Sequence, residues 1–240
     1  MVALVSGPTV ANSLSVTIPS TGAGNCLIVG VCAFAQTTAV SGITLGGAAG
    51  NFGQIPGAVA RTATGGALTD CCVEVWADPN CAGGQTAIVV SGPSSTSVDT
   101  GDGGVFVLEY SGLAATLGAL KDQLAVTAIG ANGTSWSVGP TGTTTQAAEA
   151  WVAFVNFFNA VSTITGAPWN HTTATGGFGL CGNQVTSSTG TATFSGTQGA
   201  GGSQTYAGVV VTLLPSSSPA AATPAPVVVP SAAVMQAANW

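Results

Sequence analysis

The sequence has 240 residues, carries charge on only 4% of them and has a formal net charge of −6 at pH 7. Its two basic residues, Arg61 and Lys121, are too few for the positive surface that nucleic-acid binding requires. We therefore expect no nucleic-acid binding. No run of about 18 apolar residues is present, so we expect no membrane insertion either.

The surface is expected to be unusually neutral. Charged residues make up roughly a quarter of an ordinary soluble chain, whereas glycine, alanine, serine, threonine and valine fill this one. Such a surface suits a protein that neighbours cover in a permanent assembly, although neutral secreted β-proteins also exist. Met1 to Val5 lacks a basic segment and soon meets Gly7-Pro8, so we predict no signal peptide and synthesis in the cytosol.

The first half of the chain reads as a series of short strands separated by glycine and proline. The run from Gly103 to Gly112 is the densest in strand formers, and its face of Phe106, Leu108 and Tyr110 is expected to point into a core. The other predicted strands are Val10–Ile18, Cys26–Phe34, Val40–Leu45, Cys71–Trp76 and Thr86–Val90, with a glycine-rich loop from Ala48 to Thr69. Cys26–Phe34 is almost continuously apolar, as a central strand would be.

The second half continues the pattern. A helical turn or loop is expected over Leu113–Leu120, and strands are predicted at Gln123–Ile129, Ser135–Val138, Glu149–Asn159, Phe178–Cys181, Thr191–Ser195 and Thr205–Leu214. No convincing amphipathic helix interrupts them. The sequence therefore predicts an all-β fold, an antiparallel jelly-roll-like β-sandwich of about ten strands formed by residues 1–214.

Composition changes at Pro215. Residues 215–240 begin with a proline-, alanine- and serine-rich segment that has too few packing residues to fold alone. We predict an extended C-terminal arm over 215–240. Its apolar side chains Val234, Met235 and Trp240 are the expected anchors in a groove of a neighbouring subunit.

The six cysteines have no paired C-x-x-C spacing, so a zinc ribbon is not expected. Cys26 and Cys32 lie an even number of residues apart and should point to the same face of their strand. We interpret the cysteines as small buried hydrophobic residues. A disulfide involving Cys72 or Cys81 is left open.

Catalytic signatures are weak. The single histidine, His171, has no nucleophile motif near it and is interpreted as a polar residue at a strand edge. Glu74, Glu109 and Glu149 lie on predicted strands, and a hydrolase would need two of them at one cleft. Structural burial is favoured over catalysis, and Glu109 and Glu149 are expected to point inward, each with a hydroxyl, a backbone amide or Lys121 as partner. We therefore expect no enzyme, no catalytic residue and no cofactor.

Two further features are candidates for ligand binding. Asp99 and Asp102 flank a glycine turn, but a calcium loop usually carries more acids, so ordinary turn chemistry is favoured and no metal is expected. Among the five tryptophans, Trp76, Trp136 and Trp151 are predicted to be core residues. Trp169 follows Pro168 in a predicted loop and is the best candidate for a surface contact, including one with a sugar.

Several segments resemble a known family. These are ITLGG at 43–47, CVEVWAD at 72–78, TAIVVSG at 86–92, GVFVLEYSG at 104–112 and TTTQAAEAWVAFV at 143–155. In this order they resemble small minor tail proteins of tailed phages that infect actinobacteria. The family usually has a tryptophan after Gly46-Gly47, where this chain has Ala48 to Phe52. The resemblance implies a virion structural protein and no catalytic residues.

The expected function is therefore structural: a phage tail or tail-tip subunit that assembles through its sandwich and its arm, made in the host cytoplasm and located in the virion. Its expected partners are copies of itself and other virion proteins. Two alternatives are kept. One is a capsid decoration protein on the head, and the other is a module that binds a host-surface glycan.

Overall fold

The computed structural model describes residues 1–34, 40–46, 48–62, 71–93, 98, 103–129, 134–158, 161–165, 168–198 and 205–217. These residues form seventeen strands and one short helix, α1 (Leu117–Leu120). Every strand pairing is antiparallel. The predicted all-β antiparallel sandwich class is confirmed, but the expected single sandwich of about ten strands is wrong, because seventeen strands form four sheets.

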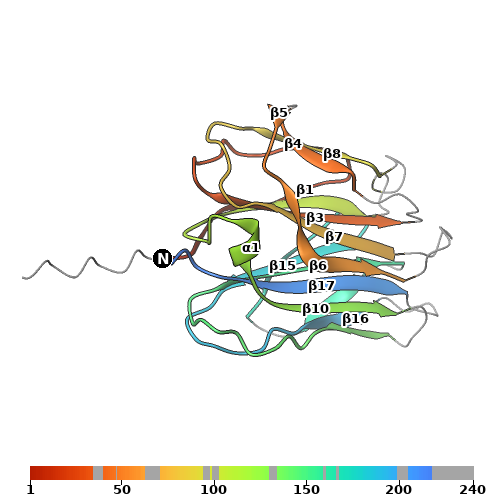
Figure 1. The fold of residues 1–240 in the computed structure, drawn as a ribbon. Helices are drawn as coiled ribbons and strands as arrows, with labels where there is room; N and C mark the ends of the chain where they lie inside the picture. The colour runs from red at the N-terminus through yellow and green to blue at the C-terminus, as the bar shows by residue number, and fades with distance from the viewer. Residues whose placement is uncertain are drawn as a thin grey trace, which may run out of the picture.

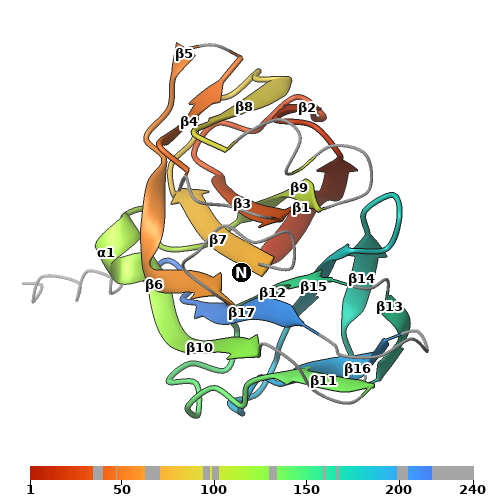
Figure 2. The same ribbon diagram turned by 90° about the vertical axis from the view of Figure 1, so that its right-hand side faces the viewer.

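The strands form four sheets stacked as four layers (Figures 1 and 2). The first outer sheet has the order β2 (Ser15–Thr17), β8 (Ala87–Ser91), β4 (Gly42–Leu45), β5 (Ala48–Ala49). The first inner sheet has the order β1 (Ala3–Ala11), β9 (Gly104–Ser111), β3 (Cys26–Phe34), β7 (Cys71–Asp78), β6 (Gly53–Arg61). The second inner sheet has the order β10 (Lys121–Ile129), β17 (Tyr206–Leu213), β12 (Ala150–Phe157), β15 (Gly179–Val185), β14 (Asn170–Thr173). The second outer sheet has the order β11 (Ser135–Val138), β16 (Phe194–Gln198), β13 (Val161–Thr165).

The strand order reveals an internal duplication. In the first half, β1-β9-β3-β7 and β2-β8-β4-β5 are the two sheets of a jelly roll, with β6 added at an edge. The second half repeats this order as β10-β17-β12-β15-β14 and β11-β16-β13. The molecule therefore consists of two jelly rolls whose inner sheets pack face to face. The second jelly roll has no counterpart of β5 in the described part of the chain.

Two threonines confirm that the halves are equivalent. The N–H of Thr21, which follows β2, donates to Gln85 O (2.9 Å), and Thr21 Oγ1 accepts from Gln85 N (3.0 Å). Thr141, which follows β11, makes the same reciprocal pair with Ala192, at 3.0 and 2.9 Å. Gln85 and Ala192 each lie two residues before the next strand, β8 and β16. In both halves, the same pair of hydrogen bonds therefore joins the segment after the first strand of the outer sheet to the segment just before the strand that pairs with it.

Three apolar cores separate the four layers. The central core, between the inner sheets, includes Ile28, Cys32, Phe106 and Phe154, and each half has a further core beneath its outer sheet. An inner sheet is covered on both faces, which explains why all nine residues of β3 are buried. The predicted core face of β9 is confirmed, and the opposite face is buried as well.

The two inner sheets interlock at a glycine. A Cβ added to Gly30 in β3 would lie 2.1 Å from Cδ1 of Phe154 in β12, so the Phe154 ring occupies the space that a side chain would fill. Nearby, Asn156 Nδ2 donates to Ala33 O at 2.6 Å. A small residue opposite a large one allows two sheets of similar topology to pack closely.

Some expected boundaries were wrong. The predicted loop from Ala48 to Thr69 contains β5 and β6, because Pro56 and Gly57 (φ +81°) form an irregularity in an edge strand that hides its alternating pattern. The predicted first strand is in fact two strands, β1 and β2. The N-terminal part of β1, around Gly7-Pro8, was missed for the same reason: it is an edge strand with register shifts. β13 and β14 were also missed.

Candidate assembly site at the root of the arm

The predicted arm anchors Val234, Met235 and Trp240 lie outside the described residues, which end at 217. The part of the arm prediction that can be examined is its root. Pro215–Ser217 were assigned to the arm, but Pro215 forms a bridge with Leu113, and Ser216 N donates to Gly112 O at 2.8 Å. These bonds tie the first arm residues to the sandwich.

The root lies at the junction of the two jelly rolls. Leu214 N donates to Leu120 O (2.8 Å), and Leu214 O accepts from Ala114 N (3.0 Å), so the end of β17 is paired with the connection between the halves. Gly112 in this connection has φ +74°, and a Cβ there would lie 2.2 Å from Met1 O. The N-terminus, the connection between the halves and the arm root therefore meet at one end of the molecule.

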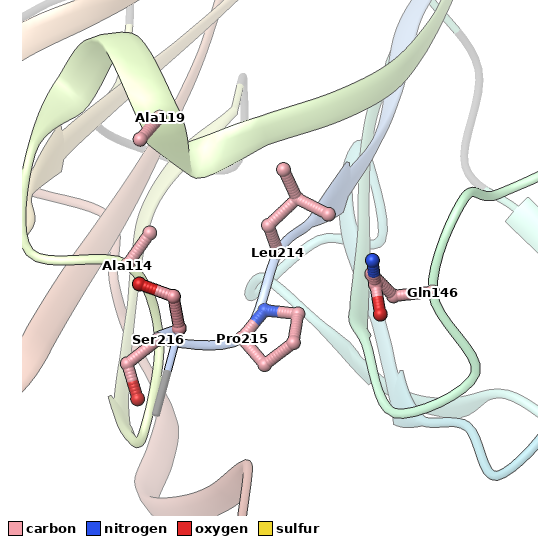
Figure 3. Close-up of a pocket in the computed structure, with 7 residues that line it drawn as sticks. Ala114, Ala119, Gln146, Leu214, Pro215 and Ser216 are labelled. Atoms are coloured by element: carbon pink, nitrogen blue, oxygen red, sulfur yellow. The ribbon is translucent and has the colours of Figure 1, made fainter. Parts of the chain in front are cut away.

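An open depression of about 490 Å³ lies at the root. In Figure 3 the side chains of Leu214 and Pro215 lie between α1 and the loop that carries Gln146. The lining consists of small apolar, hydroxyl and amide groups: Ala114, Ala119, Gln146, Leu214, Pro215, Ser216 and Ser217. With no charged residue in its lining, this surface suits contact with an uncharged polypeptide.

Two carboxyl groups hold the loop at the edge of the depression. Asp122 Oδ2 accepts from Thr145 N (2.6 Å), Asp122 Oδ1 accepts from Thr145 Oγ1 (3.0 Å), and Glu149 Oε1 accepts from Gln146 N (3.0 Å). Glu149 is fully buried, and its Oε2 has no partner among the described residues. Burial raises the pKa of Glu149 from 4.5 to about 7; the bond from Gln146 N opposes this shift, and nearby Asp122 adds to it.

The raised pKa of Glu149 predicts a pH-dependent stability. The folded chain holds the Glu149 proton more tightly than the unfolded chain, so stability should fall as pH rises from about 4.5 to about 7. Glu149→Gln, which mimics the protonated group, should remove this loss. Urea unfolding of both proteins between pH 4.5 and 8 should show the variant gaining on the wild type up to about pH 7 and keeping a constant advantage above it. Parallel pH curves for the two proteins would contradict the assignment.

The described surface is almost free of charge. Glu74, Asp78, Glu109 and Glu149 are buried, while Arg61, Lys121 and Asp122 are only half-buried. Thus none of the Asp, Glu, Lys and Arg side chains in the described ranges is largely exposed. Within the described ranges, the surface that composition predicted to be neutral has little charge because the charged side chains there are buried or half-buried.

The predicted carboxylates occupy separate structural settings. Glu109 accepts from Ser6 Oγ (3.1 Å), Gly22 N (2.7 Å) and Asn25 Nδ2 (2.6 Å), and is thus buried with the expected hydroxyl and amide partners. Glu74 forms an ion pair with Arg61 instead. The ionic partner of Glu74 (Arg61), the three donors to Glu109 and the backbone donor to Glu149 (Gln146 N) are all different groups. Lys121, offered as a possible partner, donates to Pro56 O (2.7 Å).

Trp169 was predicted to be a surface contact, and this was wrong. It is only 9% exposed, donates from Nε1 to Thr193 O (2.8 Å), and packs its ring against Trp151 and Phe194. Proximity to Pro168 indicated a loop but could not indicate burial beneath the second outer sheet. Trp136 and Trp151 are core residues as predicted, whereas Trp76 is half-buried.

His171 is exposed on the edge strand β14, which agrees with its interpretation as a polar edge residue, although β14 itself was not predicted. Asp99 and Asp102 lie outside the described residues. No group of three His, Cys, Asp or Glu side chains in the described ranges could hold a metal ion. The described part of the chain also has no helix of the length and apolarity needed to cross a membrane.

All six cysteines are buried thiols without disulfides, which confirms their interpretation as small buried residues. Cys26 and Cys32 share the central core, as their spacing predicted. Burial raises the pKa of the Cys72 thiol to about 12 and that of Cys81 to about 11. These thiols are therefore poor nucleophiles at neutral pH.

Comparison with known proteins returned no matching protein-family model, curated protein or solved structure. The jelly-roll description consequently depends on the strand order alone.

Proposed function

We propose that this chain is a structural subunit of a bacteriophage particle, in the tail or tail tip, that assembles through its stacked jelly rolls and its C-terminal arm. It is made in the host cytoplasm and incorporated into the virion, where it contacts copies of itself and other virion proteins. The proposal includes no catalytic activity, cofactor, nucleic-acid binding or membrane insertion.

The uncharged surface carries the proposal. An independent soluble monomer usually keeps about a quarter to a third of its surface residues charged, because like charges prevent association. Charged residues are depleted in the cores of protein–protein interfaces. On the described surface of this chain no Asp, Glu, Lys or Arg side chain is largely exposed, which is the composition expected of a surface that partners cover.

Two further considerations support a virion role. The segments from ITLGG to TTTQAAEAWVAFV resemble minor tail proteins, as described above. Jelly rolls are also frequent in viral capsid proteins, although they occur in lectins and enzymes too, so this second consideration is an analogy of fold.

The arm supplies the joining mechanism. Its root is fixed at Leu214–Ser216 by backbone hydrogen bonds, and 23 residues follow Ser217 in the sequence. Fully extended, they would reach about 75 Å. An arm fixed at one end and bound to a neighbour at the other adds a linked second contact, which raises avidity without enlarging the first interface.

Truncation after Ser217 tests the arm while keeping the hydrogen bonds at its root. The full chain and the truncated chain are each supplied during replication of the parent phage, and incorporation is measured by mass spectrometry of purified particles. The full chain should be incorporated, and the truncated chain should fold normally but be lost from particles by at least tenfold. Equal incorporation would overturn the role of the arm, and absence of the full chain from particles would overturn the virion proposal.

Immunogold labelling of the same particles locates the subunit. Labelling of tails supports the tail assignment, whereas labelling of heads selects the capsid decoration alternative. Burial of Trp169 removes the tryptophan on which the glycan-binding alternative was based.

A further inference from the structure

In the described part of the chain, the second outer sheet has one strand fewer than its counterpart in the first half. In the first half, β4 pairs with β5 through Thr44↔Ala49 and Leu45↔Ala48. In the second half, β13 occupies the position of β4 and pairs with β16, but among the described residues no strand pairs with its other side. A sheet edge of this kind presents N–H and C=O groups that accept a strand from another chain.

The local sequence explains the missing strand. β4 turns through Gly46, which has φ +54°, directly into β5. After β13 the chain has only residues 166–169 before β14 begins, and one of them is Pro168, which has no N–H for a sheet ladder. Thr163 on β13 is exposed, and Ile164 packs only partly into the core beneath.

A buried amide in the same sheet also lacks partners. Gln198 on β16 pairs with Val161, the first residue of β13, and its side chain is 3% exposed. Neither Oε1 nor Nε2 of Gln198 has a hydrogen-bond partner within the described part of the chain. Native proteins leave few buried polar groups unpaired. Among the described residues, this end of the second outer sheet is therefore incompletely hydrogen-bonded.

We propose that the free edge of β13 binds the segment Val227–Val229 from the arm of a second copy, as an added strand of the second outer sheet. This inference rests on the proposed role of the arm and names its receptor. Three consecutive valines favour an extended strand. Pro226 and Pro230 limit the pairing to a short stretch, which suits the place of a strand as short as β5.

The distance between the arm root and β13 indicates that the added strand comes from a second copy. α1, which borders the arm root, and β13 lie on opposite sides of the molecule in Figure 2. Nine residues lie between Ser217 and Val227, and the ten steps from one to the other span at most about 35 Å. A folded body of this size is on the order of 40 Å across, and a path around its surface is longer than its diameter. The arm of a neighbouring subunit meets no such limit.

Cross-linking between separately prepared variants tests the pairing. Full chains carrying Thr163→Cys and full chains carrying Val228→Cys are mixed and treated with a short bis-maleimide, and hetero-dimers are identified by mass spectrometry. The native cysteines are all buried, so labelling is directed to the new thiols. Val126→Cys, an exposed position on the edge strand β10, replaces Thr163→Cys in the matched control.

The expected result is at least fivefold more hetero-dimer with Thr163→Cys than with Val126→Cys, and loss of that excess when Val228→Cys is combined with Val227→Pro and Val229→Pro. Equal yields would overturn the proposal. Cross-linking within single chains of a Thr163→Cys/Val228→Cys double variant, without cross-links between chains, would also overturn it. If the cross-link fails but the chain is still found in purified particles, only the β13 receptor is wrong; absence from particles refutes the proposed function separately.

Discussion

Replacing Gly30 by valine is expected to lower the free energy of unfolding by about 3 kcal/mol, the upper part of the usual range for overpacking a core. The new Cβ would lie 2.1 Å from Cδ1 and 2.3 Å from Cε1 of the Phe154 ring. That ring is fully buried between the two inner sheets and cannot move outward. Urea unfolding followed by tryptophan fluorescence would measure the loss.

Gly42→Val is the matched control. Gly42 also lies in a strand, but a Cβ there would meet no atom within 4 Å, so valine should be neutral or slightly stabilising. A double variant, Gly30→Ala with Phe154→Leu, should be more stable than the sum of the single changes predicts, because the smaller side chain makes room for the new methyl group. An effect of Gly30→Val on stability no larger than that of Gly42→Val would show that the inner sheets are not packed as described.

Arg61→Met is the second change expected to have a large effect, also about 3 kcal/mol. Arg61 Nη2 pairs with Glu74 Oε1, and the Glu74 side chain is only 3% exposed. Gln54 Nε2 (3.0 Å), Val40 N (3.3 Å) and Trp76 Nε1 (3.3 Å) also donate to this carboxylate. Removing the cation leaves a buried charge without its ionic partner, which typically costs 3–5 kcal/mol. The lower end applies because a quarter of the Arg61 side chain is exposed.

Adding Glu74→Gln to Arg61→Met should restore most of the lost stability. The amide oxygen of glutamine can still accept hydrogen bonds, and no buried charge remains. Urea unfolding of the wild type, both single variants and the double variant gives the coupling energy directly. A double variant no more stable than Arg61→Met alone would show that lost packing, and not the unpaired charge, causes the effect.

The strands were predictable where local sequence and environment agree. Cys26–Phe34 was predicted with the bounds observed for β3, and Ser135–Val138 with those of β11. β3 is buried on both faces, which requires a continuous apolar run, and such a run is visible without any tertiary information. β6 was missed because an edge strand tolerates Pro56 and a left-handed Gly57, and these residues look like loop residues in a sequence.

The duplication was not predicted, although both halves have the same strand order. The two inner sheets must complement each other where they touch, so Gly30 in one lies opposite Phe154 in the other. Complementary packing makes equivalent strands differ in sequence, as CLIVGVCAF of β3 and AWVAFVNF of β12 show. Shared topology therefore left little shared pattern to detect.

Only part of the candidate site could be addressed from the sequence. The arm over 215–240, inferred from the proline-rich composition after Leu214, and the virion role, inferred from the resemblance, both stay predictions. The receptor proposed at β13 could not be inferred from the sequence. It is recognised only by comparing the two halves: β5 pairs with β4, whereas no described strand takes the equivalent position beside β13.

The sequence by itself determined the all-β class, the buried cysteines and a surface with little charge, because these follow from composition and from the period-two pattern of single strands. Only the tertiary structure decided the four layers, the pairing of Arg61 with Glu74, the burial of Trp169 and the edge of β13 with which no described strand pairs. Each of these depends on which distant strands become neighbours, and hydrogen bonding between strands is not encoded in the local pattern of either one.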